Sequence, residues 1–177
     1  MFVFLSATLA SVLCASDDAR GGIDLIVMID RSGSMSGRPV ELLPALAADL
    51  LARNGEANRV RHRLAVVGFA SRARVELPFT AIHDVAREHL ERDRRESGGT
   101  TDVAAAFAAA ARLFASIPAD PARRRAAVIV TDGIPSVPRV DSAAYERDLR
   151  RFVANNFSCV TIDVLLVRGR GAAHDVL

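Results

Sequence analysis

Carboxylate and hydroxyl side chains gather in three short clusters of this 177-residue chain. The first cluster is DRSGS at residues 30–34, the second is GGTTD at residues 98–102, and the third is TDG at residues 131–133. Oxygen ligands of this kind suit Mg²⁺, Mn²⁺ or Ca²⁺, whereas softer metals prefer thiolate or imidazole ligands. If the fold brings the three clusters together, we expect them to form one divalent-cation site.

The spacing of the first cluster favours this interpretation. Alternate residues of the turn, Asp30, Ser32 and Ser34, can point their oxygens in the same direction, and Gly33 allows the backbone to bend around an ion. Taken alone, the cluster could equally be a serine-rich turn that caps a helix, and Asp-Gly is common in ordinary turns. The combination of all three clusters, each at the end of a predicted element, is what favours a cation site.

The elements that must position these clusters follow from hydrophobic patterning. Apolar runs at 23–29, 63–70, 126–130 and 160–167 predict core strands, and the alternating segment 74–79 predicts an antiparallel edge strand. The first and third clusters directly follow two of these strands. Because ligands bind at the carboxyl ends of parallel strands, we expect the clusters to converge at one edge of the sheet.

Helical periodicity separates the predicted strands. We expect helices from about residue 42, with Pro44 in or just before the first turn, along 82–90, after the second cluster, and along 145–153 with Asp141 or Ser142 as the cap. In the helix after the second cluster, an alanine and phenylalanine stripe predicts the buried face. The pattern predicts an α/β fold with a doubly wound, mostly parallel sheet and helices on both faces. The chain ends soon after its last strand, so we expect a closing helix and strand to be absent.

The three clusters together resemble the metal-ion-dependent adhesion site of von Willebrand factor A and integrin I domains. DRSGSMSG and VIVTDGIPS both match the pattern of that family, and GGT before a helix supplies its middle loop. The resemblance extends from about Ile23 to the C-terminus. It implies a Rossmann-like von Willebrand factor A fold.

The resemblance also implies roles for individual residues. Ser32 and Ser34 would coordinate the cation directly, while Asp30 and Asp132 would act through water or hydroxyl contacts. The middle loop would contribute a threonine, which is Thr101 when counted back from the Ala106-Phe107 pair and Thr100 when counted from the glycines; we favour Thr101.

A cation with few direct carboxylate ligands keeps positive character and an open position for a carboxylate from a partner. We therefore expect a single cation, Mg²⁺ first and Mn²⁺ or Ca²⁺ as alternatives, and a protein ligand that binds through an acidic residue. Adhesion or interaction is the expected function, with no small-molecule cofactor.

An enzyme is the first alternative. Asp30 could be the covalent nucleophile of a Mg²⁺-dependent phosphohydrolase, but Ser32 stands where a second acid is needed, and the sequence contains no lysine to bind the transferred phosphate. Neither glycine-rich nucleotide fingerprint occurs. The sequence therefore predicts binding and no catalytic residues.

A second alternative is a subunit of a chaperone-like or chelatase-like assembly, by analogy of fold. The N-terminus distinguishes it from adhesion. Residues 1–15 form an apolar run of signal-peptide length, followed by a linker at 16–22 and a single domain at 23–177. This arrangement predicts an extracytoplasmic protein, secreted or associated with the envelope.

The net charge and the remaining single residues say less about function than the three clusters do. The net charge of +2 gives no reason to expect nucleic-acid binding. Cys14 and Cys159 are not expected to pair, and Cys159 is placed in a buried strand. The arginine run 123–125 is expected to be a solvated helix end, and Asp163 inside an apolar strand is left either facing a sheet edge or paired with an arginine.

Overall fold

The computed structural model describes residues 22–35, 42–58, 61–85, 90, 99–133, 137 and 141–167. The predicted N-terminal segment 1–15 and nearly all of the linker 16–22 lie outside these residues. None of the described helices combines the length and hydrophobicity needed to cross a membrane.

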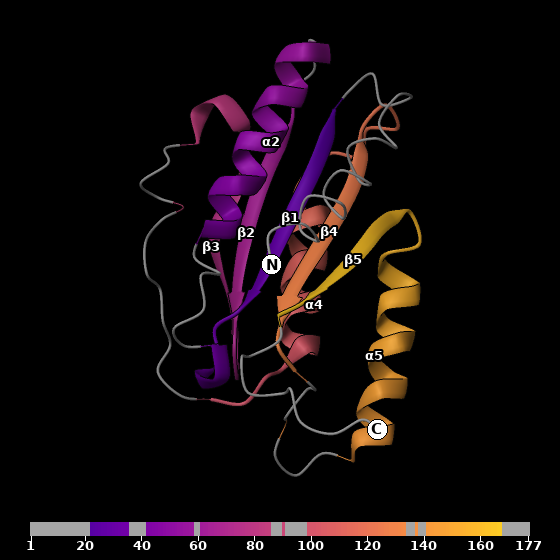
Figure 1. Cartoon of the computed structure of the whole chain (residues 1–177). Helices are drawn as coiled ribbons and strands as arrows, with labels where there is room; N and C mark the ends of the chain where they lie inside the picture. Colours follow the sequence, from indigo (N-terminus) through magenta and orange to yellow (C-terminus); the bar gives the residue numbers. More distant parts are fainter. Residues whose placement is uncertain are drawn as a thin grey trace, which may run out of the picture.

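A five-stranded sheet forms the centre of the described part (Figure 1). Its strands are β1 (Ile23–Asp30), β2 (Arg63–Phe69), β3 (Ala73–Ala81), β4 (Arg124–Thr131) and β5 (Val160–Leu166), in the spatial order β3-β2-β1-β4-β5. Strands β2, β1, β4 and β5 run parallel, and β3 pairs antiparallel with β2. The predicted doubly wound, mostly parallel α/β fold is confirmed, including the antiparallel edge strand.

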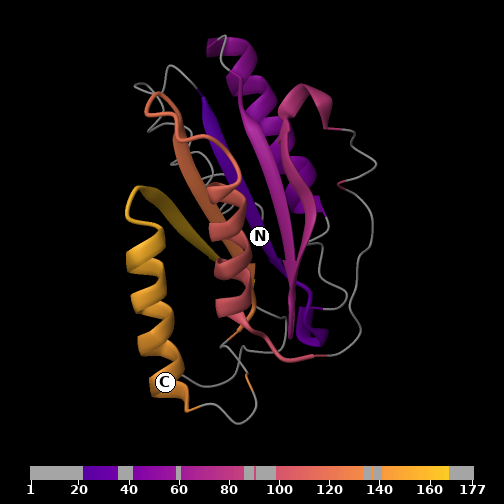
Figure 2. The same cartoon turned by 180° about the vertical axis from the view of Figure 1, so that it is seen from behind.

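Helices cover both faces of this sheet. Helix α2 (Leu43–Asn58) packs on one face, and α4 (Val103–Ala115) and α5 (Ser142–Asn156) pack on the other, as the two opposite views show (Figures 1 and 2). Successive side chains of a strand point to opposite faces. In β1, Leu25 and Val27 therefore join the α2 side while Ile26 and Met28 join the α4 side, which explains its uninterrupted apolar run.

The helix ends follow the predicted patterns. Pro44 is the second residue of α2, where its missing N–H costs no hydrogen bond. Asp141 caps α5 by accepting hydrogen bonds from the backbone N–H groups of Ala143 and Ala144. The predicted inner stripe of α4 is buried, and its members include Phe107 and Phe114.

Two expectations about secondary structure need correction. The stretch from residue 82 begins as a 3-10 turn, Ile82–Asp84, and Val85 is already extended; residues 86–89 lie outside the described part. Strand β5 is an edge strand of the described sheet rather than a core strand, and Val164 and Leu166 are 57% and 60% exposed. The apolar run did not reveal this, because a run does not show whether another strand lies beyond it.

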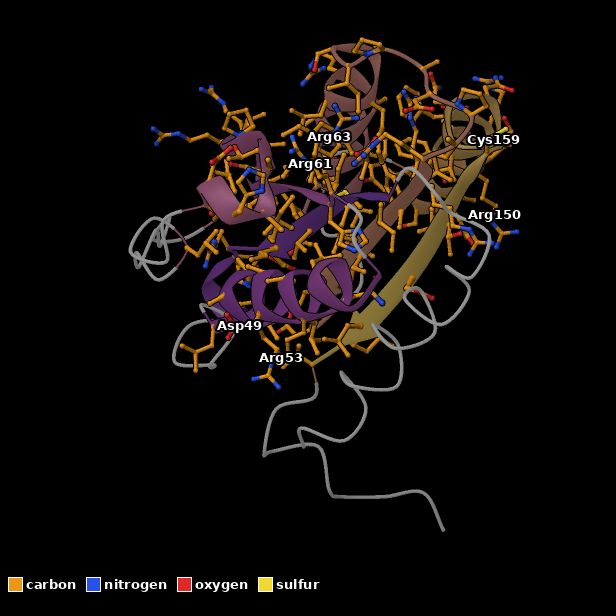
Figure 3. All side chains as sticks on the ribbon, turned by 90° about the horizontal axis from the view of Figure 1, so that it is seen from above. Asp49, Arg53, Arg61, Arg63, Arg150 and Cys159 are labelled. Carbon is orange, nitrogen blue, oxygen red and sulfur yellow. The ribbon has the colours of Figure 1, made fainter. Side chains whose placement is uncertain are left out.

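The position of Cys159 was also predicted wrongly. It precedes β5 and is exposed, and Figure 3 shows its side chain at the periphery of the molecule. Within the described ranges, Asp163 forms no ion pair with an arginine, and one of its carboxylate oxygens, Oδ2, is buried without a hydrogen-bond partner.

A buried ionic cluster lies at the amino ends of the parallel strands, opposite the predicted cation site. The carboxylate of Asp24, in β1, accepts hydrogen bonds from Arg63 at 2.7 Å and from Arg123 at 2.6 Å. Arg123 also donates to the backbone oxygen of Arg61. The arginine run is therefore not a solvated helix end, because its first member holds a buried carboxylate.

His62 completes this end of the sheet as a buried neutral imidazole. Its Nδ1 accepts a hydrogen bond from the backbone N–H of Ile23 at 3.0 Å, so the proton must reside on Nε2, which lies 2.9 Å from Oδ1 of Asn54. Burial lowers the pKa of His62, and the charge of Arg123 lowers it further, while Asp24 opposes both effects.

We expect this histidine to make folding sensitive to mild acid. Its pKa is lower in the folded chain than the usual 6.5, so the stability it contributes is present above pH 6.5 and is lost as the pH falls below it. One proton taken up on unfolding changes the free energy of unfolding by about 1.4 kcal/mol per pH unit. Urea denaturation at pH 7.5 and pH 5 should show a flatter dependence for His62→Asn, whose amide oxygen can still accept from Ile23. Equal pH dependence in the two proteins would contradict the expectation.

Candidate functional site

Asp30 forms the buried centre of the predicted site at the carboxyl end of β1. It is fully buried, and its two carboxylate oxygens have different partners. Oδ1 accepts from the backbone N–H of Ser32 at 2.8 Å, and Oδ2 accepts from the hydroxyl of Thr131 at 2.6 Å. Asp30 therefore shapes the turn that follows β1 and ties it to the end of β4.

A row of hydroxyls continues from this turn towards the third cluster. The Oγ atoms of Ser32 and Ser34 are 3.1 Å apart, and the hydroxyl of Ser34 donates to Oδ1 of Asp132 at 3.1 Å. Ser32 is buried, Ser34 is exposed and Asp132 is half-buried. The structure thus brings together four of the five predicted site residues, Asp30, Ser32, Ser34 and Asp132, from two loops 98 residues apart.

The second cluster reaches the same edge of the sheet through the backbone. The N–H of Asp102 donates to the carbonyl oxygen of Ala70, just beyond β2, at 2.8 Å. Next to it, the N–H of Arg31 donates to the carbonyl oxygen of Phe69 at 2.6 Å, which joins the ends of β1 and β2. Thr101 is 5% exposed, whereas Thr100 is half-buried.

Asp102 has a structural role that its place in the cluster did not reveal. Its Oδ1 caps α4 by accepting from the N–H of Ala105 at 3.1 Å, and it also accepts from the hydroxyl of Tyr145 at 2.9 Å. The Tyr145 oxygen in turn accepts from the N–H of Ala104 at 2.8 Å. Burial raises the pKa of Tyr145 to about 12, and the Asp102 carboxylate contributes to the rise. The phenol therefore stays protonated and keeps α5 hydrogen-bonded to the loop that carries Thr101.

Arg31, the second residue of DRSGS, also has a partner that spacing could not predict. Its guanidinium donates to the Glu76 carboxylate in β3 from Nε at 3.3 Å and from Nη2 at 3.0 Å. Both side chains are buried, at 5% and 8% exposed. The link joins the first loop to the edge of the sheet.

The donor set fits a hard cation. The Ser34 hydroxyl lies beside both the Ser32 hydroxyl and the Asp132 carboxylate, and hydroxyls and carboxylates are ligands that Mg²⁺ accepts. Across the described ranges, no three His, Cys, Asp or Glu side chains gather as a potential metal-binding group. A cation at this place would therefore depend on hydroxyls.

Comparison with known proteins agrees with this fold. A family model described as von Willebrand factor type A domain matches residues 25–134. No curated protein matches the sequence.

Among the solved structures that share this fold with the chain are the following three. The conserved hypothetical protein BatB from Bacteroides thetaiotaomicron has a TM-score of 0.56 at 20% identity, over 82% of this chain and 66% of that one. Proximal thread matrix protein 1 from the mussel byssus has a TM-score of 0.59 at 16% identity, over 81% and 37%. The PilB minor pilin from Streptococcus sanguinis has a TM-score of 0.53 at 22% identity, over 70% and 33%.

This chain spans less than two thirds of each of these structures, and at such identities the likeness concerns the fold alone. The family match covers more than half of the chain and includes all three clusters. The resemblance seen in the three clusters is thereby confirmed at the level of the family. The chain belongs to the von Willebrand factor type A domain family and is a protein-interaction domain.

Proposed function

We propose that this domain binds a protein partner through a divalent cation, Mg²⁺ first, held where the three loops meet. The observation that carries the proposal is the position of Ser34, whose hydroxyl lies within hydrogen-bond distance of both Ser32 and Asp132. Oxygens from two separate loops are thereby concentrated at one point. These oxygens are hydrogen-bonded to one another here, and a bound cation would replace those hydrogen bonds with metal–oxygen contacts.

In this proposal each side chain has a distinct task. Hydroxyl oxygens come from Ser32, Ser34 and Thr101, and a nearby carboxylate comes from Asp132. Asp30 stabilises the turn of the first loop through its hydrogen bonds to Ser32 and Thr131. When bound, the cation would supply a Lewis-acidic position for a carboxylate of the partner. The proposed function is binding; catalysis would need a nucleophile and a general base within hydrogen-bond reach of the bound group.

We extend the proposal to an extracytoplasmic setting. Its support is the apolar run at residues 1–15. Among proteins of similar fold are a thread matrix protein of the mussel byssus and a minor pilin, names that are compatible with such a setting. Analysis of the mature N-terminus after expression of the full chain with a secretion pathway tests this, and an uncleaved, retained chain would contradict it.

Thermal unfolding with and without cation tests the binding site. A ligand that binds only the folded state stabilises it by about 2.7 kcal/mol at 100 times its Kd, which corresponds to a rise in Tm of about 5–10 °C for a chain of this size. We expect such a rise with Mg²⁺ or Mn²⁺ for the wild-type chain, and none for the double variant Ser32→Ala/Ser34→Ala. The proposal fails if no divalent cation raises the Tm, or if the double variant responds as the wild type does.

The open position can be tested with Mn²⁺ as a probe. Mn²⁺ bound to the chain enhances the relaxation rate of water protons as long as exchangeable water is coordinated to it. Added glutarate, a simple dicarboxylate, should displace that water and so lower this relaxation enhancement. Acetamide is the matched neutral control and should leave it unchanged. An enhancement insensitive to glutarate would contradict carboxylate binding.

A further inference from the structure

The proposed function assigns no role to a buried charge pair beside the candidate site, the Arg31–Glu76 ion pair. Arg31 lies between Asp30 and Ser32, two residues of the site, and its backbone N–H extends the ladder between β1 and β2 by bonding to Phe69. Its side chain turns away to the two-point contact with Glu76. A guanidinium held at two points by a carboxylate has little freedom to rotate.

Two features of β2 and β3 make this contact possible. The pairing register shifts between Val66 and Val67, which pair with Leu77 and Val75, so Glu76 is the extra residue of a β-bulge. Bulges redirect a side chain from its regular alternation. Next to it, Gly68 leaves space that any side chain would fill, since a Cβ there would lie 2.0 Å from Oε1 of Glu76 and 3.3 Å from Cγ of Arg31.

We infer that Arg31 and Glu76 are positioning residues of the candidate cation site. Anchored in β3, the pair fixes the backbone from Asp30 to Ser34 before any cation arrives, so that the hydroxyls of Ser32 and Ser34 need little further ordering. Partners that orient metal ligands from outside the coordination shell commonly change metal affinity tenfold to a hundredfold when replaced. This inference rests on the proposed function for its cation readout.

The test compares Mn²⁺ affinity in three variants by calorimetry, at a temperature where circular dichroism shows each to be folded. Glu76→Gln removes the charge, and Gly68→Ala displaces the carboxylate without removing it, because the new Cβ occupies the place of Oε1. Both should raise the Kd for Mn²⁺ at least tenfold. Arg63→Gln is the matched control, since it breaks an ion pair of Asp24 at the other end of the sheet and should leave the Kd unchanged.

Amide hydrogen exchange in cation-free protein gives a second readout that does not depend on binding. The amides of Ser32 and Met35, bonded to Asp30 and to the Ser32 carbonyl, should exchange at least tenfold faster relative to Val27 in Glu76→Gln and Gly68→Ala, but not in Arg63→Gln. Unchanged exchange would overturn the positioning role. So would an unchanged Kd in the two site variants, or an equal rise of Kd in all three.

The two arms also separate this inference from the proposed function. A wild-type chain that binds no Mn²⁺ refutes the cation site, and the exchange experiment then decides by itself whether the pair orders the loop. A wild-type chain that binds Mn²⁺, with affinity unaffected by Glu76→Gln and Gly68→Ala, refutes the positioning role and leaves the cation site intact.

Discussion

Replacing Asp30 by alanine is expected to lower the free energy of unfolding by about 3 kcal/mol and to abolish stabilisation by divalent cations. The fully buried carboxylate satisfies the Thr131 hydroxyl and the N–H of Ser32, and each buried group left without its partner costs about 1–3 kcal/mol. The corresponding fall in Tm for a chain of this size is about 6–12 °C. Thermal unfolding with and without Mg²⁺ measures both effects.

Asp132→Ala is the matched control for this prediction. Asp132 is half-buried, and the exposed Ser34 hydroxyl that donates to it can bond to water instead. Without cation, Asp132→Ala should therefore lower the free energy of unfolding by less than about 1 kcal/mol. The Tm increase caused by Mg²⁺ should nevertheless disappear as it does in Asp30→Ala. If Asp132→Ala keeps that increase, or if Asp30→Ala is as stable as the wild type, the division of tasks between the two carboxylates is wrong.

Patterns local in sequence predicted most of the fold. The apolar run at 23–29 predicted a strand covered on both faces, and the structure buries every residue of β1. Alternation at 74–79, interrupted by Pro78, predicted an edge strand, which β3 is. These inferences succeeded because hydrophobic period and proline placement follow from the geometry of one element and its immediate cover.

The residues of the candidate site were also found locally, because each cluster directly ends a strand or begins a helix. What sequence spacing could not provide was the partner of each residue. Arg31 meets Glu76 only because a bulge and a glycine coincide, and Asp102 meets Tyr145 only because the first turn of α5 lies beside the start of α4. Both contacts depend on register and packing between distant segments, about which hydrophobic period carries no information.

Exposure at the sheet edge was missed for a related reason. An apolar run such as 160–167 is compatible with a central strand or an edge strand, since the number of neighbouring strands is a property of the whole sheet. The prediction for the arginine run at 123–125 failed for the same reason, since its contact with Asp24 also depends on how distant segments pack. A lone acid within an apolar strand, Asp24, was the available indication that a distant arginine must reach it, because a buried carboxylate needs a partner.

The largest loss of stability unrelated to the site is expected from Asp24→Ala. Burial raises the pKa of this carboxyl, but the hydrogen bonds from Arg63 and Arg123 outweigh that effect and hold the pKa below the usual 3.8. Removing the carboxylate leaves two guanidiniums without their shared partner, and breaking a buried ion pair costs about 3–5 kcal/mol. Because the Arg63 side chain is 26% exposed and can reach water, we expect about 3 kcal/mol, measured by urea denaturation at pH 7.

Arg63→Gln is the control variant for the stability loss expected of Asp24→Ala. Asp24 then keeps Arg123, whose Nε and Nη2 lie 2.9 and 2.6 Å from Oδ1, so the loss in the free energy of unfolding should be no more than about half that of Asp24→Ala.

Acid should reproduce the larger loss in the wild type. A carboxyl with a lowered pKa stabilises the fold above pH 3.8 and stops doing so as the pH falls through its pKa in the folded chain. Neither variant should change the affinity for Mn²⁺, since the cluster lies at the amino ends of the strands and the candidate site at their carboxyl ends. An Asp24→Ala protein within about 1 kcal/mol of the wild type would show that water, rather than this carboxylate, satisfies the two arginines.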